Sequence, residues 1–235
     1  MTAAEIVSEL KKLGSDSYKR TMLRHGAKEP FFGVKIEDLK KIQKRIKKDY
    51  KLSLELFDTG IGEAMYLAGL IADDEQMTKK DLQKWVESAN WYFQSEYAVG
   101  WTAAESRFGW ELGLKWIDSK KEGIASTGWA TLSSLVSIKP DEELHLAGLK
   151  KLLARVEKTI HDAPDRIRYT MNGFVIAVGS HVAPLTAEAI KTAKKIGEVT
   201  VDMGDTACQV PSAVEYIDKV KQRGSIGKKR KMARC

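Results

Sequence analysis

Cysteine is almost absent from this sequence, and its scarcity limits the chemistry that the chain can carry. The two cysteines are Cys208 and the terminal Cys235, so neither a disulfide framework nor a thiolate zinc cluster can be assembled. The four histidines are scattered, without the i, i+4 spacing of a metal site. We therefore expect no metal ion and no cofactor, and a reducing cytoplasm as the compartment.

The sequence also lacks the signatures of targeting and of classical nucleotide enzymes. The N-terminus reaches Lys11 and Lys12 without the apolar run of a secretory signal, and no stretch approaches the ~18 apolar residues of a membrane span. No glycine-rich phosphate loop, Walker motif or nucleophile elbow is present. We expect no membrane partner, and nucleotide-dependent enzymes are disfavoured.

Positive charge is concentrated at the C-terminal end of the chain. The formal net charge is +7, and five of these charges come from the last eight residues, which leaves +2 for everything before. The five are Lys228, Lys229, Arg230, Lys231 and Arg234. Because residues 223–235 hold two glycines and few apolar anchors, they predict a flexible basic tail, either phosphate-binding or merely solubilising.

Apolar residues recur at helical spacing over most of the chain. One such set is Ile36, Leu39, Ile42 and Ile46. Thr78 followed by Asp81 predicts a helix start, and Gly123 predicts a helix end. These signals give about ten helices joined by short connections. We predict an all-α fold with a single helical domain over residues 1–222, either an array of helix pairs or an irregular bundle.

All six tryptophans fall within about a fifth of the chain, between Trp85 and Trp129. Trp85, Trp101 and Trp129 lie on apolar helical faces, which favours core packing. Trp91 follows a turn at a helix start and suits either stacking on a flat ligand or a hydrophobic staple. Glu96, close to this tryptophan, could stabilise a cationic sugar at a breaking N-glycosidic bond, although a solvated helix face explains it equally well.

Basic residues also recur on one of the predicted helices. The set of interest is Lys40, Lys44, Arg45 and Lys47. A solvated helix face is the default interpretation of such a set, but helical arrays gather cations on one concave surface where they neutralise phosphates. We therefore take these four residues, together with Lys228, Lys229, Arg230 and Lys231 of the tail, as candidate phosphate-binding residues.

Three features occur in a fixed order along the chain. They are Phe-Phe-Gly-Val-Lys at residues 31–35, a central Asn90-Trp91 turn, and helix pairs that extend over residues 2–220. In these features the sequence resembles the bacterial DNA alkylation repair (AlkD-like) family, which has a similar Phe/Tyr-Gly-Val segment before a helix. The resemblance implies a HEAT-like (armadillo-type) α-α superhelix whose concave basic face holds duplex DNA. Active members of the family excise cationic alkylated purines with an Asp, an Arg and a further Trp.

The family's catalytic positions are substituted in this chain. Trp91 matches the central Trp, but Ser95 stands at the Asp position, with Glu96 beside it. The helix that carries the family's Arg corresponds to residues 123–132, which hold Trp129 and no arginine, and the later Trp corresponds to Phe174. The resemblance thus assigns Trp91, Ser95, Trp129 and Phe174 to contact with DNA or a lesion. Residues 201–208 fall outside the catalytic pattern and suggest a distinct branch.

Three functional hypotheses remain open at this stage. The first is a non-enzymatic or weakly active DNA-binding member that recognises damaged, distorted or branched DNA through backbone contacts and shape. The second is an active alkylpurine N-glycosylase that uses Glu96 in place of the Asp. The third is an armadillo-like scaffold that binds protein, with weak salt dependence. The sequence leaves the oligomeric state open.

Overall fold

The computed structural model describes residues 1–204, 206 and 208–234. Asp205 and Ala207 of the closing segment and the terminal Cys235 lie outside the described residues. In the described part of the chain the fold is all-helical, with thirteen α-helices and no strand. The predicted fold class is confirmed.

The helices follow one another with short connections. The first six are α1 (Ala3–Leu13), α2 (Asp16–Arg24), α3 (Ile36–Ile46), α4 (Tyr50–Asp58), α5 (Gly62–Ile71) and α6 (Lys79–Ser88). A π-helix, η1 (Phe93–Val99), continues directly into α7 (Gly100–Glu105). The remainder are α8 (Gly109–Trp116), α9 (Glu122–Ile138), α10 (Leu146–Thr159), α11 (Asp165–His181), α12 (Thr186–Ile196) and α13 (Ala213–Gln222). Short 3-10 helices precede α10, α11 and α12: η2 (Asp141–Glu143), η3 (Ile160–Asp162) and η4 (Ala183–Leu185).

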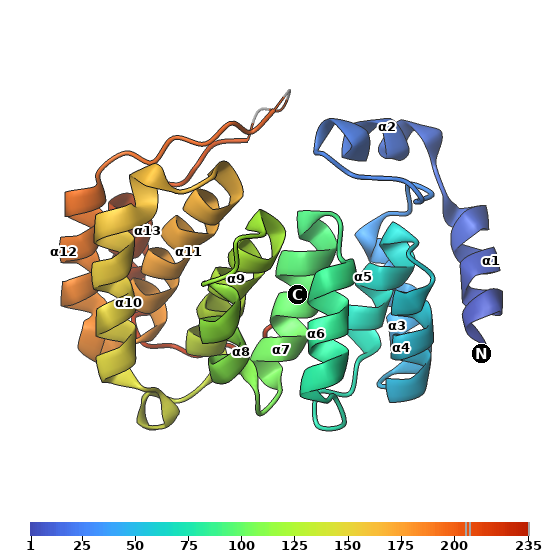
Figure 1. Cartoon of the computed structure of the whole chain (residues 1–235), viewed down its shortest axis with the longest axis horizontal. Coiled ribbons are helices and arrows are strands. Elements are labelled where there is room, and N and C mark those ends of the chain that lie inside the picture. The colour runs from blue at the N-terminus through green and yellow to red at the C-terminus, as the bar shows by residue number, and fades with distance from the viewer. Residues whose placement is uncertain (205, 207, 235) are drawn as a thin grey trace.

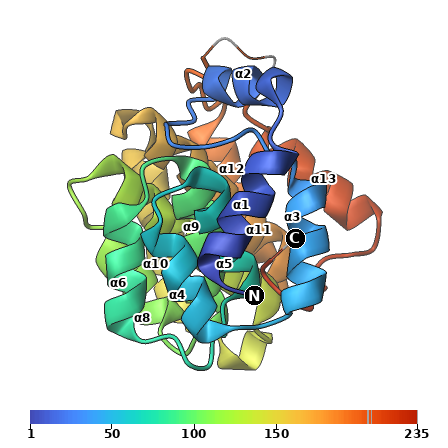
Figure 2. The ribbon, with the colours of Figure 1, turned by 90° about the vertical axis from the view of Figure 1, so that its right-hand side faces the viewer.

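Successive helices stack side by side along the long axis of the molecule, from the N-terminal helices at one end to α12 and α13 at the other (Figure 1). Viewed along this row, α4, α6, α8 and α10 lie on one side, whereas α3, α13 and the C-terminus lie on the other (Figure 2). The layer between them consists of α5, η1 with α7, α9 and α11, which contact one another in that order. We call this layer the inner helices.

The inner helices form the hydrophobic core. Every residue of α5 is buried, and its Gly69 lies against η1 so closely that a Cβ would come 2.5 Å from the Cβ of Ala98. Only a glycine permits this approach, because heavy atoms in van der Waals contact stand about 3.5–4 Å apart. No single helix in the described ranges is long and apolar enough to cross a membrane; α11 and α12 pass that test only together, across a bend of 115°.

Local sequence signals place some helix ends correctly and others not. Thr78 and Asp81 form the predicted capping box at the start of α6, with each side chain accepting a hydrogen bond from the other's backbone N–H. The predicted helix end at Gly123 is wrong, because α9 begins at Glu122 and Gly123 lies in its first turn.

The loop before α3 is held by a single carboxylate. The backbone N–H groups of Phe32, Gly33 and Val34 all donate to the buried Glu63 of α5, at 2.6–3.0 Å. Gly33 has a φ of +82°, and a Cβ there would stand 2.4 Å from the carbonyl oxygen of Ser15. The Phe-Gly-Val segment therefore requires glycine for both conformation and space.

The C-terminal segment packs against the inner helices and does not form the flexible arm that its composition predicts. Its Gly227 N–H donates to Ser180 O at the end of α11 (2.9 Å), and its Arg230 N–H donates to Ser137 O at the end of α9 (2.8 Å). Ala233 is fully buried. We call residues 223–234 the C-terminal strap.

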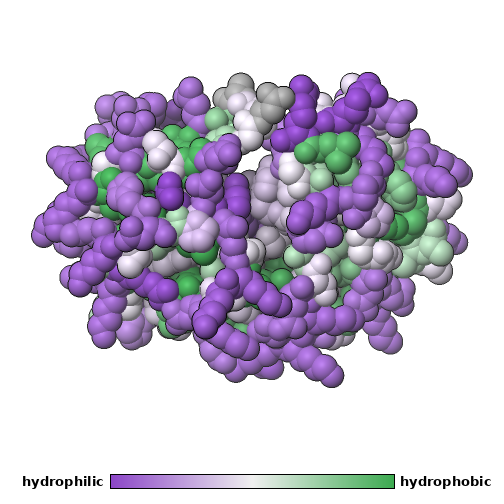
Figure 3. Space-filling model, turned by 45° about the horizontal axis from the view of Figure 1, so that its top comes forward, coloured by the Kyte–Doolittle hydropathy of each residue, from purple (hydrophilic) through white to green (hydrophobic). Residues whose placement is uncertain are grey.

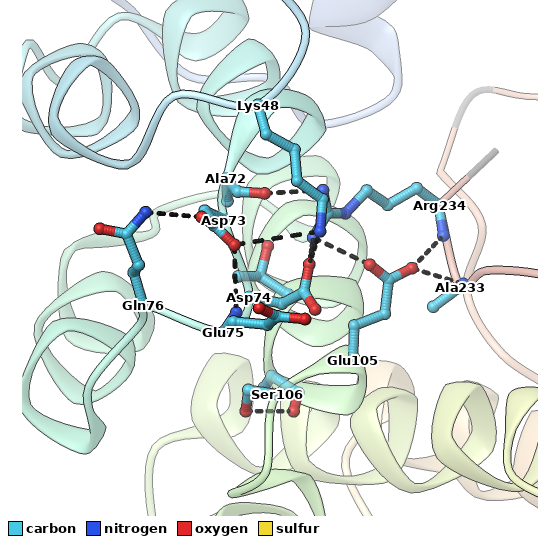
Figure 4. A network of polar contacts seen from close by, with 12 residues as sticks. Lys48, Ala72, Asp73, Asp74, Glu75, Gln76, Glu105, Ser106, Ala233 and Arg234 are labelled. Atoms are coloured by element: carbon cyan, nitrogen blue, oxygen red, sulfur yellow. Dashed lines mark hydrogen bonds and ion pairs between the residues drawn. The ribbon is translucent and has the colours of Figure 1, made fainter.

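Arg234 anchors the far end of the strap. Its Nη1 donates to Ala72 O at the end of α5 (2.8 Å), and its Nη2 lies 3.0 Å from Asp74 and 2.8 Å from Glu105 (Figure 4). The last carbonyl groups of a helix have no partner within it and carry its partial negative charge. The cations of the strap satisfy these ends, so polar contacts add to the few apolar anchors of the strap, Ile226 and Ala233.

Candidate nucleic-acid interface

A cleft of about 830 Å³ opens at the N-terminal ends of the inner helices. Four groups of residues line it: the end of α2, the turn that leads into η1, the first turns of α9 and α11, and the segment between α12 and α13. Among them are His25, Trp91, Tyr92, Glu96, Glu122, Ser126, Arg166 and Tyr169. Figure 3 shows the hollow on this face of the molecule, with hydrophilic side chains on both sides of it.

A second wall of the cleft comes from the segment between α12 and α13, which runs out from the body of the protein towards α2 (Figure 1). Arg168 holds its first half by donating to Thr200 O (2.7 Å), and Asn172 holds its second half by donating to Pro211 O (2.9 Å). A Cβ on Gly204 would stand 3.7 Å from Arg24 O of α2. The segment therefore reaches α2 and borders the cleft with it.

Glu96 and Arg166 form a bidentate ion pair at the base of the cleft. Arg166 Nε donates to one carboxylate oxygen of Glu96 at 2.9 Å, and Arg166 Nη2 donates to the other. The Glu96 side chain is 3% exposed and that of Arg166 is 25% exposed. Burial raises the pKa of Glu96, and the hydrogen bonds and charge of Arg166 oppose this shift. Both carboxylate oxygens of Glu96 thus accept hydrogen bonds from the guanidinium of Arg166.

Two tyrosines hold the guanidinium group of Arg166 in place. Its carbon lies 4.3 Å from the ring centre of Tyr92 and 4.6 Å from that of Tyr169, within cation-π range. The backbone N–H of Arg166 donates to Glu122 (2.9 Å). Arg166 Nη1 makes no hydrogen bond to the residues that the structure describes. A fixed cation with a free donor therefore lines the cleft.

Trp91 anchors α2 to the body of the protein. Its indole N–H donates to His25 O at 2.9 Å, and its ring stacks on Phe93 with centres 4.7 Å apart. One face of the ring is covered and its donor is used. Trp91 lines the cleft and is half-buried there. It acts as an anchor for α2, and its predicted contact with DNA stays a prediction.

The three other candidate contact residues are almost fully buried. Ser95 lines the cleft but is only 3% exposed, so its contact with DNA stays a prediction. Trp129 is 1% exposed and Phe174 is fully buried, and the two pack on each other between α9 and α11, with ring centres 5.2 Å apart. The assignment of Trp129 and Phe174 to DNA contact is wrong for this conformation, since both side chains lie in the core.

The candidate phosphate-binding residues separate into two groups. Lys44, Lys47 and Lys231 line a common groove at the C-terminal ends of the inner helices. Two others form ion pairs within the protein. Arg45 pairs with Glu9 of α1 (2.6 Å), and Lys229 pairs with Asp141 (2.7 Å) and donates to Val136 O.

Three further members of the predicted phosphate-binding set do not line this groove either. These are the half-buried Lys40 and the exposed Lys228 and Arg230. The backbone carbonyl oxygen of Lys228 lies 2.8 Å from Nδ1 of His181. The prediction that Lys40, Lys44, Arg45 and Lys47 share one basic face is therefore right only in part.

The cleft itself is not a basic surface. Its described lining holds three cationic side chains, Arg24, Lys28 and Arg166, and three carboxylates, Glu96, Glu122 and Asp202. No group of three or more potential metal ligands occurs among the described residues. What the cleft offers is an aromatic wall and one fixed guanidinium.

A family model described as "DNA alkylation repair enzyme" matches residues 6–217. The chain belongs to this family. It is 30% identical over 228 residues to "Uncharacterized protein Lin0241" of Listeria innocua and 29% identical to "Uncharacterized protein Lmo0209" of Listeria monocytogenes. Each match covers 95% of this chain and 99% of the relative.

One solved structure superimposes on this chain over the full length of both, with a TM-score of 0.91 and 35% identity. It is described as "A new family of proteins related to the HEAT-like repeat DNA glycosylases with affinity for branched DNA structures". The predicted HEAT-like superhelix and the family resemblance are both confirmed.

Arg166 is a residue of the candidate site that the sequence analysis did not identify. The arginine was sought in residues 123–132, but the site takes its guanidinium from α11, seventy positions after Glu96. The available signal was Arg166 and Tyr169, one turn apart at the start of a helix that follows Pro164.

Proposed function

We propose that this protein binds DNA, prefers branched or distorted structures, and does not excise bases. Membership of the DNA alkylation repair enzyme family and the likeness to a protein with affinity for branched DNA support the binding. The observation that carries the proposal is the ion pair between Glu96 and Arg166, because it determines which charge faces the cleft.

Excision of an alkylated purine requires an anion beside the sugar, since positive charge develops there in the transition state. Glu96 is the carboxylate nearest to the family's Asp position, yet it is 3% exposed and both its oxygens contact Arg166. A sugar approaching this site would meet the guanidinium and not the carboxylate. The ion pair occupies the carboxylate of Glu96, and it leaves the guanidinium of Arg166 in a position where it can bind a phosphate.

Recognition through this cleft depends on shape and stacking more than on net charge. The aromatic wall of Tyr92 and Tyr169 flanks Arg166, and Nη1 of this arginine is available to a phosphate oxygen. Stacking of an exposed base on an aromatic ring contributes about 1–3 kcal/mol without regard to sequence. Unpaired or unstacked bases occur at branch points, so a branched substrate offers this cleft more than a regular duplex does.

Binding to a four-way junction and to a linear duplex of the same length tests the proposal. Fluorescence anisotropy should show tighter binding to the junction, and an affinity that falls as salt is raised. Tyr169→Ala should weaken junction binding by about tenfold, because it removes one stacking surface. The control Tyr216→Ala, at an exposed tyrosine of α13, should leave binding unchanged.

Two results would contradict the proposal. Failure of the protein to bind either DNA would remove its basis. Equal affinity for junction and duplex, unaffected by Tyr169→Ala, would mean that the cleft takes no part in recognition. Affinity for protein partners with little dependence on salt would instead favour the scaffold hypothesis.

A further inference from the structure

A second groove, of about 660 Å³, lies at the C-terminal ends of the inner helices. We call it the basic groove, because six cationic side chains line it against two carboxylates. The cations are Lys44, Lys47, Lys48, Lys139, Lys231 and Arg234, and the carboxylates are Asp74 and Glu105. The cleft described above has equal numbers of each, so the stronger positive surface is this one.

The two carboxylates of the groove are already neutralised. Arg234 pairs with both Asp74 and Glu105, and Lys48 pairs with Asp74 at 2.7 Å (Figure 4). The hydrogen bond from Lys48 and the charges of Arg234 and Lys48 lower the pKa of Asp74 despite its burial. Lys44, Lys47 and Lys231 have no carboxylate partner among the described residues, so their charges face solvent.

The C-terminal strap adds to this charge. The inner helices end here, and helix C-termini carry partial negative charge. Ala72 O accepts from Arg234 and Val136 O from Lys229. These contacts fix the backbone of the strap, and Lys231 of the same segment lines the groove. The strap thus neutralises Asp74, Glu105 and two helix carbonyls, and it adds Lys231 to the four lysines that the rest of the chain supplies.

The basic groove and the cleft lie at opposite ends of the same helices. Ser126 lines the cleft and Ile138 lines the groove, twelve residues later on α9. At 1.5 Å of rise per residue they are about 18 Å apart along the helix. The cleft and the groove are therefore two distinct surfaces, which one branched DNA can contact at the same time.

We infer that the basic groove binds the phosphodiester backbone of a second duplex arm of a branched DNA whose branch point occupies the cleft. This inference rests on the proposed function and deepens it, by giving a reason why a branch is preferred over a linear duplex. Exposed lysines that have no carboxylate partner are the side chains that neutralise phosphates and release counterions. A junction whose branch point lies in the cleft can place a second arm in the groove, and this additional contact would favour it over a linear duplex.

The test uses the double charge reversal Lys44→Glu with Lys231→Glu, at two exposed positions of the groove. The matched control is Lys150→Glu with Lys151→Glu, two exposed lysines of α10 on the opposite side of the molecule (Figure 2). Both variants change the net charge by the same amount. Binding of the full chain to a four-way junction and to a linear duplex is followed by anisotropy over a salt series.

The groove variant should lose junction affinity by at least about tenfold, and its salt slope should fall by about 2, since each phosphate contact contributes about 0.9. Its duplex affinity should stay within twofold of the parent, as should both affinities of the control. Unchanged junction affinity in the groove variant would overturn the inference. Equal losses on junction and duplex would overturn it too, because the groove would then serve the same arm as the cleft.

The outcome separates this inference from the proposed function. If the parent protein binds the junction through Tyr169 and the groove variant binds equally well, the inference alone fails. If the parent protein binds neither DNA, the proposed function fails. Thermal melting of both variants confirms that the exposed substitutions leave the fold intact.

Discussion

Buried carboxylates are neutralised in different ways at the two ends of the inner helices. At their N-terminal ends Glu96 and Arg166 neutralise each other within the fold, and two tyrosines fix the pair. At their C-terminal ends Asp74 and Glu105 are neutralised by Arg234 of the C-terminal strap, which arrives from the far end of the chain. The first arrangement gives a neutral, aromatic cleft, and the second gives a basic groove.

This contrast indicates how the family scaffold can change its use without changing its fold. Where a glycosylase needs a free carboxylate, the cleft offers an arginine. At the other end of the helices, the strap neutralises the carboxylates and two helix carbonyls and so strengthens a basic groove. Both changes favour phosphate over a sugar cation. The following experiments separate the two ends.

The largest effect is expected from Glu96→Gln in the cleft. Removing one partner of a buried ion pair leaves the other charge unpaired, a loss of about 3–5 kcal/mol when both are fully buried. Arg166 is 25% exposed, so we expect a decrease of about 2–3 kcal/mol in the free energy of unfolding. Thermal melting should show a fall of about 5–10 °C. An unchanged melting temperature would mean that the pair does not hold the cleft together.

Arg234→Ala should have the next largest effect, this time at the basic groove. The change leaves Asp74 and Glu105 without their shared guanidinium and exposes Ala72 O. We expect a loss of about 2 kcal/mol, measured by urea denaturation. The matched control is Lys231→Ala, at an exposed residue of the same strap, which should change stability by less than about 0.5 kcal/mol. Equal effects of the two would contradict the anchoring role of Arg234.

Trp91→Phe should loosen one wall of the cleft without unfolding the protein. The substitution keeps an aromatic ring against Phe93 but removes the hydrogen bond to His25 O. A hydrogen bond of this kind contributes about 1 kcal/mol. Amide exchange should therefore accelerate in α2 and remain unchanged in α9. Acceleration spread over both helices would show that Trp91 supports the whole core and not α2 alone.

The smallest effect is the pH dependence of the strap. Burial lowers the pKa of His181 below its ordinary value of 6.5, helped by Lys229 and Arg230 and opposed by its hydrogen bond to the Lys228 carbonyl. As the pH falls below about 6.5 the unfolded chain binds the proton before the folded one does, so stability decreases there. Melting temperatures between pH 8 and 5.5 should fall less steeply in His181→Gln. Parallel curves would contradict this assignment.

The sequence predicts the fold better than the site, for physical reasons. Helical periodicity and the Thr78–Asp81 capping box are local, and both are confirmed. The Glu96–Arg166 pair joins residues seventy positions apart, and no local pattern connects them. Trp129 and Phe174 were placed at the surface by analogy with the family, whereas the helical faces that carry them are apolar and buried.

The position of the C-terminal strap could not be predicted from the sequence either. Its composition of lysine, arginine and glycine is typical of a mobile end. What holds it is a row of helix C-terminal carbonyls and two carboxylates from other parts of the chain. Such partners become visible only when the helices are stacked, so composition alone predicts the charge of this segment but not its place.

The most direct test of the central claim is base release from an alkylated duplex, with the protein in excess over DNA, at low salt and in a single turnover. The account predicts no release of methylpurines by the parent protein, and none by Glu96→Gln, while the parent still binds a four-way junction under the same conditions. Release by the parent that disappears in Glu96→Gln would contradict it, since the carboxylate would then be free to act on the sugar.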